Sequence, residues 1–156
     1  MSAWRECLQP QMTTEIRERA LRFLARREYS KAELFERLAR EGIEPEELRE
    51  VLEELEKEEL LSDARYVGQL LHARIGRYGR QHILKELFEK GVPHELIEAA
   101  KERIDEAELA TLRSVWEKKF GKKPEDRKEL AKQVRFLQGR GFSLDEIFRV
   151  IEPSDE

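Results

Sequence analysis

Apolar residues recur every three or four positions along most of this chain. In the stretch 31–57 they include Leu34, Leu38, Leu48 and Leu52, and charged residues fill most of the positions between them. This period is typical of helices that bury one face, and no run of alternating apolar and polar residues indicates a strand. The sequence therefore predicts an all-α protein.

Helix start signals divide the apolar pattern into nine segments. A Ser or Asp followed three residues later by Glu has capping-box spacing, in which each side chain accepts a hydrogen bond from a backbone amide of the first turn. Three such pairs are expected to open helices: Ser30 with Glu33, Asp105 with Glu108, and Ser143 with Glu146. Prolines suited to a first turn open three more, at Pro45, Pro93 and Pro124. Asp63 is expected to cap the fourth helix, and residues 1–13, before the first helix at Thr14, are expected to be a flexible lead-in.

The chain interrupts its helices three times in the same way, at Gly42, Gly91 and Gly141, which are 49 and 50 residues apart. A leucine stands four residues before each glycine, and an apolar residue follows each one directly. Glycine ends helices because it adopts the left-handed conformation without steric cost. A repeat of this length predicts stacked modules. We therefore expect three tandem three-helix repeats, of helix-turn-helix type, that form an elongated, curved body.

The repeat also predicts module boundaries. They are 14–60 for the first module, 61–104 for the second and 105–152 for the third, followed by a tail at 153–156. In the second module, the fifth helix is expected to bury an apolar face that includes Leu87 and Phe88.

Composition places the chain among soluble helical proteins. Charged residues make up 41% of the 156 positions, which favours helices, and the formal net charge is −4. The single cysteine, Cys7, forms no intramolecular disulfide, as expected in a reducing compartment. No apolar stretch has the length of a membrane span. We expect a cytoplasmic protein that is a monomer.

The distribution of charge says more than the total. Residues 64–85 contain no Asp or Glu, and residues 118–140 contain nine Lys or Arg against three acids. Residues 44–59 contain nine Glu against two basic residues. A local basic face can meet a polyanion or an acidic protein despite the acidic total. The glutamate run is either a solvated face or a surface that keeps one side of the molecule away from DNA.

No pattern indicates a metal, a cofactor or catalysis. His72, His82 and His94 are not spaced as a ligand set, and there is no phosphate-binding glycine loop or nucleophile elbow. We expect a protein that binds no cofactor and is not an enzyme.

Four stretches resemble one known family. They read ALRFLARREYSKAEL (20–34), DARYV (63–67), GRYGRQHILKELFEKGV (76–92) and FLQGRGFSLDEIFRVI (136–151). In this order they are similar to the RecX family of recombination regulators, over roughly residues 14–152. The resemblance implies tandem three-helix repeats that bind the RecA recombinase along the groove of its filament on DNA. It also implies inhibition of filament growth, ATP hydrolysis, strand exchange and coprotease activity.

The chain departs from the family pattern at three positions. Ser62 stands where many members have an Asp, Arg80 where they have a Pro, and His82 where they have an Arg. These departures leave the predicted fold intact but weaken any transfer of contact residues from the corner 76–82.

The basic segments supply the candidate partner-binding residues for the RecA filament or for DNA. The alternative for each is a solvated basic face, a flexible loop or a helix cap. The candidates are Arg74, Arg77, Tyr78, Arg80, Lys85, Lys118, Lys119, Lys122, Lys123 and Arg140.

Two other functions remain open from the sequence. One is a helical-repeat protein that binds nucleic acid directly and acts without RecA, and the other is a generic helical scaffold for another protein. The steep salt dependence of a phosphate-dominated binder would distinguish the first of these.

Overall fold

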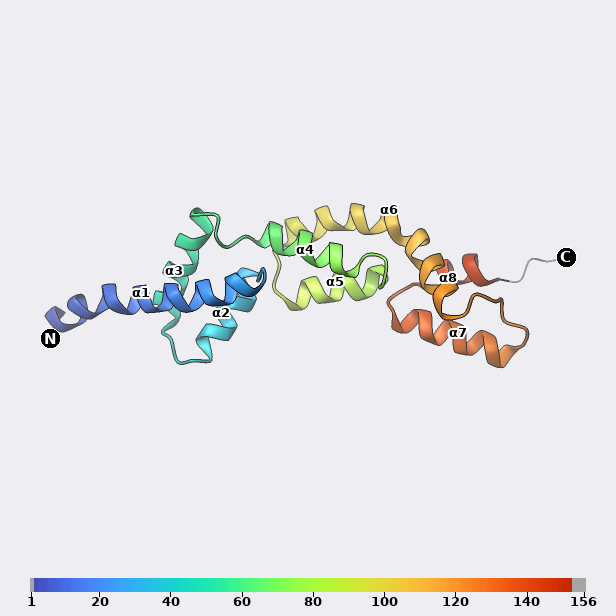
Figure 1. Ribbon diagram of the computed structural model, residues 1–156, viewed down its shortest axis with the longest axis horizontal. Coiled ribbons are helices and arrows are strands. Elements are labelled where there is room, and N and C mark those ends of the chain that lie inside the picture. Colours follow the sequence, from blue (N-terminus) through green and yellow to red (C-terminus); the bar gives the residue numbers. More distant parts are fainter. Residues whose placement is uncertain (1, 153–156) are drawn as a thin grey trace. The chain divides into compact units, whose positions relative to one another are not determined.

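The computed structural model describes the backbone of residues 2–152 and the side chains of residues 12–152 (Figure 1). The side chain of Cys7 and the predicted tail at 153–156 lie outside this part. The described chain is all-helical, as predicted, and has no strand. Its helices are α1 (Ser2–Arg26), α2 (Lys31–Ala39), α3 (Pro45–Lys57), α4 (Asp63–Arg74), α5 (Arg80–Glu89), α6 (His94–Lys119), α7 (Arg127–Gly139) and α8 (Leu144–Ile151).

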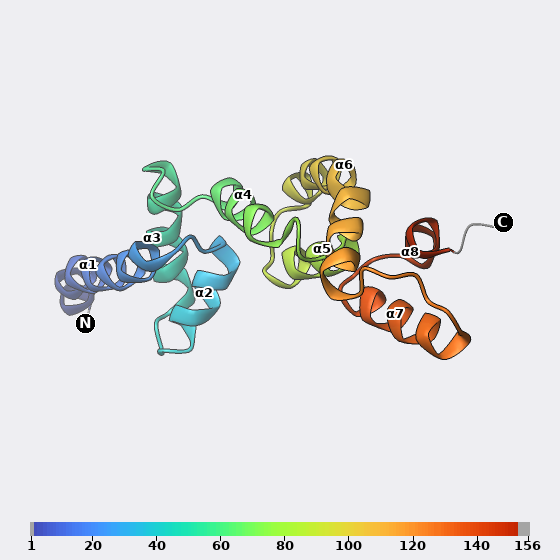
Figure 2. The ribbon, with the colours of Figure 1, turned by 45° about the vertical axis from the view of Figure 1, so that its right-hand side comes forward.

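The chain forms two compact units. Unit 1 comprises residues up to Gln69 together with 90–93, and unit 2 comprises 70–89 and the residues from His94 onward. In unit 1, α2 and α3 pack beside α1 (Figure 2). Their facing leucines, among them Leu34, Leu38 and Leu52, are fully buried in one core cluster. Each such leucine stabilises the fold by about 1.5–3 kcal/mol relative to an exposed position.

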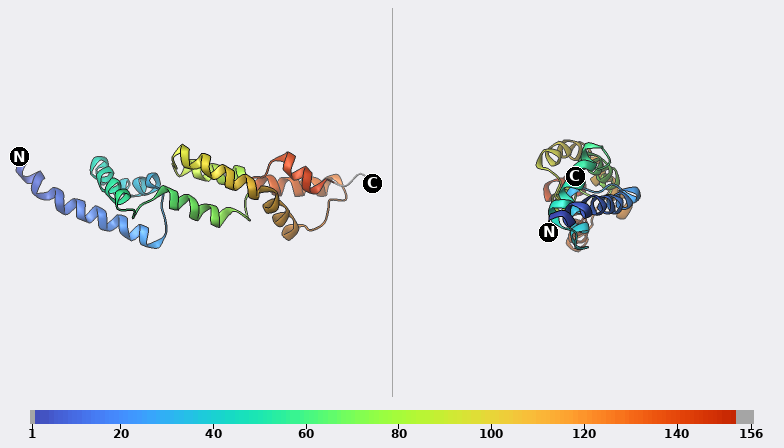
Figure 3. Two further views of the ribbon diagram at one scale, coloured as in Figure 1. Left: turned by 90° about the horizontal axis from the view of Figure 1, so that it is seen from above. Right: turned by 90° about the vertical axis from the view of Figure 1, so that its left-hand side faces the viewer.

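Unit 2 is organised around the long helix α6. Helix α5 packs beside its first part, and α7 and α8 lie beside its last part (Figure 3). A core cluster of this unit joins Leu112 and Val115 of α6 with Leu137, Phe142 and Ile147. Because Phe142 follows Gly141 directly, the turn itself places a large apolar side chain in this core.

Three predictions about helix boundaries were wrong. Helix α1 begins at Ser2, so the segment predicted to be a flexible lead-in before Thr14 is helical. The predicted sixth and seventh helices are one continuous helix, α6, because no Gly or Pro interrupts residues 94–119. Helix α7 begins at Arg127 and not at Pro124, since Asp126 is the residue whose side chain accepts from the first-turn amide of Glu129.

The caps of α2 and α4 also differ from expectation. Ser30 Oγ accepts from the Glu33 amide, but the Glu33 carboxylate does not return to the cap and binds Arg27 instead. At α4 the cap is Ser62, whose Oγ accepts from the Arg65 amide at 3.2 Å. Asp63 accepts from the backbone amide of Lys31 at 2.8 Å, and so it caps α2 from another part of unit 1.

Candidate partner-binding surface

The turn at residues 90–93 contacts the start of α2 in unit 1. Ser30 Oγ donates a hydrogen bond to the carbonyl oxygen of Lys90 at 2.6 Å. Lys90 Nζ in turn donates to Glu33 Oε2 at 2.8 Å. A Cβ added to Gly91 would lie 2.6 Å from the Cβ of Ala32, so the two backbones approach closely. Residue 91 must therefore be glycine for its small size as well as for its φ of 66°.

Glu33 is the centre of an ion cluster at this contact. Its side chain is buried, and it accepts two hydrogen bonds from Arg27, both at 3.1 Å, besides the one from Lys90. Burial opposes ionisation of this carboxyl, but Arg27 and Lys90 outweigh it and hold the pKa of Glu33 below its ordinary value. The Arg27 guanidinium also lies 3.6 Å from the centre of the Tyr29 ring. Ser30 and Glu33 thus hold the turn at 90–93, and Arg27 holds Glu33.

A second contact of the same kind lies in unit 2. The amide of Gly79 donates to the carbonyl oxygen of Arg140 at 2.7 Å, and the amide of Gln81 donates to that of Gly141 at 3.1 Å. A Cβ on Gly79 would lie 2.6 Å from the backbone of Gly141, and a Cβ on Gly141 would lie 2.6 Å from His82. The start of α5 and the turn between α7 and α8 therefore meet backbone against backbone.

The two contacts occupy equivalent repeat positions. Ser30 and Gly79 each stand 12 residues before a repeat glycine, while Lys90 and Arg140 directly precede the glycine of the next module. In each case the first residue donates to the carbonyl oxygen of the second. We call these contacts joint 1 and joint 2. Gly42, the repeat glycine of the first module, makes no such contact within the described chain, and a Cβ there would meet nothing within 4 Å.

Joint 2 brings together four of the predicted partner-binding residues. Arg140 donates to the carbonyl oxygen of Arg77 at 3.2 Å, and its guanidinium lies 5.0 Å from the centre of the Tyr78 ring. Arg74 lies 5.9 Å from the same ring, and His82 stacks on it at 4.2 Å. The result is a cationic surface built around a half-buried tyrosine.

Two of the predicted arginines are held by partners inside the fold. Arg74 forms a bidentate pair with Glu86, with both hydrogen bonds at 2.9 Å. Arg80 Nε lies 3.2 Å from Asp105 Oδ1. The side chain of Arg77, in contrast, is exposed and has no ion pair with another residue whose side chain the structure describes. Arg77 is therefore the arginine of this corner most open to a partner.

A buried glutamate, Glu108, caps α5. Both oxygens of Glu108 accept from the backbone amide of Arg80, at 2.9 and 3.2 Å, and the residue is only 4% exposed. Burial and the neighbouring carboxylate of Glu146 raise the pKa of Glu108 to about 7, although the Arg80 amide opposes the shift. Glu108 was predicted to belong to the cap of its own helix. The signal that could have revealed its role is its place on the buried side of α6, between Ile104 and Leu112.

The predicted lysines lie apart from joint 2, with one exception. Lys119 Nζ is 5.2 Å from the centre of the Phe136 ring, and the guanidinium of Arg140 is 5.2 Å from the same ring. Lys122 and Lys123 line one depression with Lys119, and Lys123 donates to the carbonyl oxygen of Glu152 at 3.0 Å. Lys118 is exposed.

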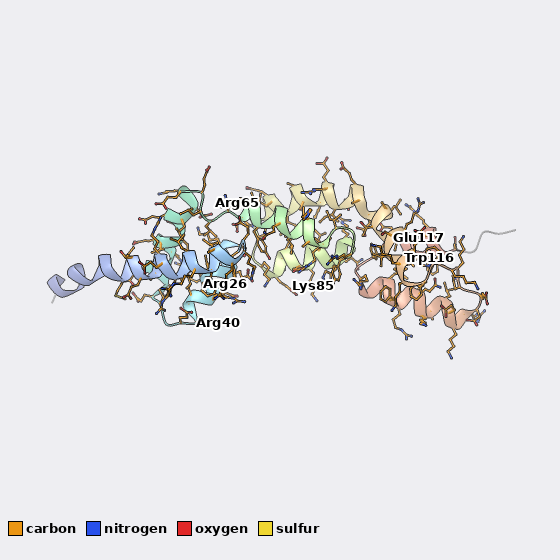
Figure 4. All side chains as sticks on the ribbon, in the orientation of Figure 1. Arg26, Arg40, Arg65, Lys85, Trp116 and Glu117 are labelled. Carbon is orange, nitrogen blue, oxygen red and sulfur yellow. The ribbon has the colours of Figure 1, made fainter. Side chains whose placement is uncertain are left out.

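Lys85 is the remaining candidate. It lies on α5 and forms a long ion pair with Glu89, with 3.9 Å between Lys85 Nζ and Glu89 Oε1 (Figure 4). Because the Lys85 side chain is 76% exposed and the distance is long, the pair contributes little to the stability of the fold. Lys85 is not among the residues that surround the Tyr78 ring. Arg65, on α4, forms an ion pair with Glu28, with 2.9 Å between Arg65 Nε and Glu28 Oε1.

Two further properties bear on function. Among the described residues, no group of three or more His, Cys, Asp or Glu side chains could hold a metal ion. Within the same part of the chain, no helix is both long and apolar enough to cross a membrane.

Three regions of the chain match the domains of one protein family. Residues 17–55 match the first three-helix domain of RecX, residues 62–100 match the second, and residues 106–151 match the third. They confirm the three tandem three-helix repeats that the sequence predicts.

Relatives and solved structures agree with these matches. The chain is 40% identical to the regulatory protein RecX of Leptothrix cholodnii, with 94% of this chain and 92% of the relative covered. It is 39% identical to that of Pseudomonas fluorescens, with 90% and 92% covered. The crystal structure of RecX from Lactobacillus salivarius has the same fold, with a TM-score of 0.75 at 20% identity over 90% of this chain and 94% of that one. The chain belongs to the RecX family of regulatory proteins.

Proposed function

We propose that this protein binds the RecA nucleoprotein filament along its groove and inhibits the recombinase, ATPase and coprotease activities of RecA. Its membership of the RecX family supports this, since relatives over most of the chain are named regulatory proteins. The protein then acts in the cytoplasm, in homologous recombination, DNA repair and the SOS response. It does so by binding as a monomer and not by catalysis.

The observation that carries the proposal is the cationic surface at joint 2. Residues 64–85 contain no acid. Arg74 of this segment and Arg140 lie near the ring of Tyr78, and Arg140 also donates to the carbonyl oxygen of Arg77. Such a surface can contact an acidic protein patch or phosphates, and a tyrosine face can pack against either partner. Occupying the filament groove with this surface would block incoming duplex and slow filament extension.

Not every arginine in this surface is a useful test of binding. Arg74 is paired with Glu86 and Arg80 with Asp105, so charge reversal at either position would place two carboxylates next to each other. Arg77 and Lys118 are exposed. Arg77 lies at this surface, and Lys118 is a candidate that lies apart from it. Substitutions at both positions leave the internal pairs intact.

The test is DNA-dependent ATP hydrolysis by the cognate RecA, with this protein added at substoichiometric and equal ratios. We expect the natural protein to suppress hydrolysis below equal ratio, and the variant Arg77→Glu/Lys118→Glu to require a higher ratio. The matched control is Arg26→Glu/Arg40→Glu, which makes the same charge change at two exposed positions of unit 1 (Figure 4).

The outcomes test separately whether the protein inhibits RecA and whether Arg77 and Lys118 belong to its binding surface. Unchanged hydrolysis at equal ratio, with folded protein, contradicts inhibition of RecA. If both variants suppress hydrolysis as well as the natural protein does, the protein inhibits RecA, but Arg77 and Lys118 do not belong to the binding surface.

A further inference from the structure

A stripe of basic side chains follows the outward face of α7, outside the residues that the sequence singled out. Lys128, Lys132 and Arg135 stand at positions i, i+4 and i+7, which places them on one side of the helix. All three are exposed, and so is Ala131 between them. Together they border a single surface depression. We call this face the α7 stripe.

The stripe has no role inside the fold. None of its three cations forms an ion pair, hydrogen bond or ring contact with another residue whose side chain the structure describes. Arg27, Arg74 and Arg80, in contrast, each bind a carboxylate of their own unit. Three like charges on neighbouring turns repel one another, so the stripe contributes nothing favourable to the isolated fold.

The acids at the edge of the stripe already have partners. Asp126 and Glu129 border the same depression. The Asp126 carboxylate accepts from the Glu129 amide at 2.7 Å, as the cap of α7. Glu129 Oε1 accepts from Gln133 Nε2 at 3.5 Å, and Gln133 is buried. These carboxylates are thus turned to the cap and to Gln133, while the cations remain in solvent.

We propose that the α7 stripe binds the phosphodiester backbone of nucleic acid without reading its sequence. Seven residues of helix rise about 10.5 Å. One nucleic-acid strand carries a phosphate about every 3.4 Å of axis, so the three cations match about three phosphates. Ala131 presents only a methyl group, which lets a backbone approach between the cations.

The chemistry of this face favours phosphates over an acidic protein. Its exposed side chains are charged, apart from Ala131, and no large apolar residue lies between the three cations. Stable protein interfaces need an apolar centre, whereas a phosphate backbone needs only a row of donors. A neighbouring depression, which is lined by Lys119, Lys122 and Lys123, shares Asp126 and Glu129 with the depression beside the stripe.

The test measures binding of the full chain to nucleic acid in the absence of RecA. A fluorescent single-stranded oligonucleotide and a duplex of equal length are titrated by anisotropy over a series of salt concentrations. The test variant is Lys128→Gln/Lys132→Gln/Arg135→Gln. The matched control is Arg26→Gln/Arg40→Gln/Lys57→Gln, which removes three exposed charges from unit 1. Glutamine is a good helix former, so both variants should fold, as circular dichroism would verify.

In the test variant, and not in the control, the affinity for the oligonucleotide should depend less steeply on salt concentration. The slope of log affinity against log salt should fall by about 2 on single strands, since each neutralised phosphate contributes about 0.7. Affinity at low salt should fall about tenfold or more, and equally for oligonucleotides of different sequence.

Three results would overturn the proposal. The first is absence of salt-dependent binding by the natural protein, and the second is an equal loss in the control variant. The third is binding of polyglutamate, through the same three residues, as tightly as the oligonucleotide, which would assign the stripe to acidic protein. Because RecA is absent, none of these results decides whether the protein inhibits its ATPase.

Discussion

Gly79 and Arg140 are joined through their backbones, with 2.7 Å between the Gly79 amide nitrogen and the Arg140 carbonyl oxygen. At the equivalent positions of the repeat, Ser30 Oγ donates to the carbonyl oxygen of Lys90 at 2.6 Å. The same joint is thus made once with a side-chain donor and once with a backbone donor. The joint therefore depends on a donor placed opposite the carbonyl oxygen before the repeat glycine, and not on a particular pair of residues.

Substitution of Gly79 by Ala should loosen joint 2. The new Cβ would lie 2.6 Å from the backbone of Gly141 and 2.7 Å from the Phe142 ring, which is fully buried. Because a backbone cannot yield as a flexible side chain does, we expect a loss of about 1–3 kcal/mol in the free energy of unfolding. Chemical denaturation measures it.

Gly68→Ala is the control for this substitution. Gly68 lies within α4, and a Cβ there meets nothing within 4 Å. Alanine should stabilise the helix by about 0.5–1 kcal/mol. Equal effects of the two substitutions would show that the close approach at joint 2 carries no energy.

Substitution of Lys90 by Met should destabilise unit 1. It removes one of the two cations that balance the buried Glu33 carboxylate. Arg27 remains, so we expect a loss of about 1.5–3 kcal/mol, the range for a hydrogen bond to a charged group. Lys101→Met is the control, because its partner Glu98 is an exposed neighbour on the same helix and its loss should cost less than about 0.5 kcal/mol. A Lys90 variant that is as stable as the Lys101 variant would contradict the ion cluster.

The same cluster predicts a dependence on acid. The pKa of Glu33 is lower in the folded chain than in the unfolded one, so ionised Glu33 favours the fold. This contribution is present above the ordinary glutamate pKa of 4.5 and is lost as the pH falls through the folded value. Glu33→Gln should flatten the acid limb of a stability profile measured by denaturation. An unchanged acid limb would show that other carboxylates determine it.

Glu108 predicts the opposite dependence. Burial and Glu146 raise its pKa from 4.5 to about 7, so the folded chain holds this proton more tightly than the unfolded chain. Its stabilising effect is complete below pH 4.5 and is lost as the pH rises through about 7. Between pH 5 and 8 the free energy of unfolding should fall by about 2–3 kcal/mol on account of this group.

Glu108→Gln is the variant that isolates this effect. The amide oxygen of Gln can still accept from the Arg80 amide, while the side chain no longer titrates. The free energy of unfolding, measured by denaturation between pH 5 and 8, should therefore change less with pH in the variant than in the natural protein. If natural and variant proteins lose stability in parallel, Glu108 does not titrate in this range.

The repeat and its glycine turns could be predicted because their causes are local. Gly42, Gly91 and Gly141 all have positive φ, as expected for helix ends that only glycine forms without strain. The continuity of α6 was missed because Asp105 and Glu108 have capping-box spacing by chance in a chain rich in acids. Spacing alone does not distinguish a cap from two residues inside a helix.

The joints were not predictable because their partners are distant in sequence. Ser30 was recognised as a cap from its neighbours, but its hydrogen bond to Lys90 crosses 60 residues. Arg74 was assigned to a partner surface because no acid lies near it in sequence, yet Glu86 binds it from the next helix. Charge runs identify which segments are basic, and only the fold decides which cations are already neutralised.

Adjacent residues of α5 provide the last prediction. The sequence placed both Leu87 and Phe88 on a buried face, but Leu87 is fully buried while Phe88 is 78% exposed. Leu87→Ala should cost about 2–5 kcal/mol, because it removes core contacts and leaves a cavity. Phe88→Ala should change the free energy of unfolding by less than about 0.5 kcal/mol, as is usual at exposed positions. Denaturation of the two variants compares them directly, and a large loss for Phe88→Ala would mean that its ring packs against the fold in solution.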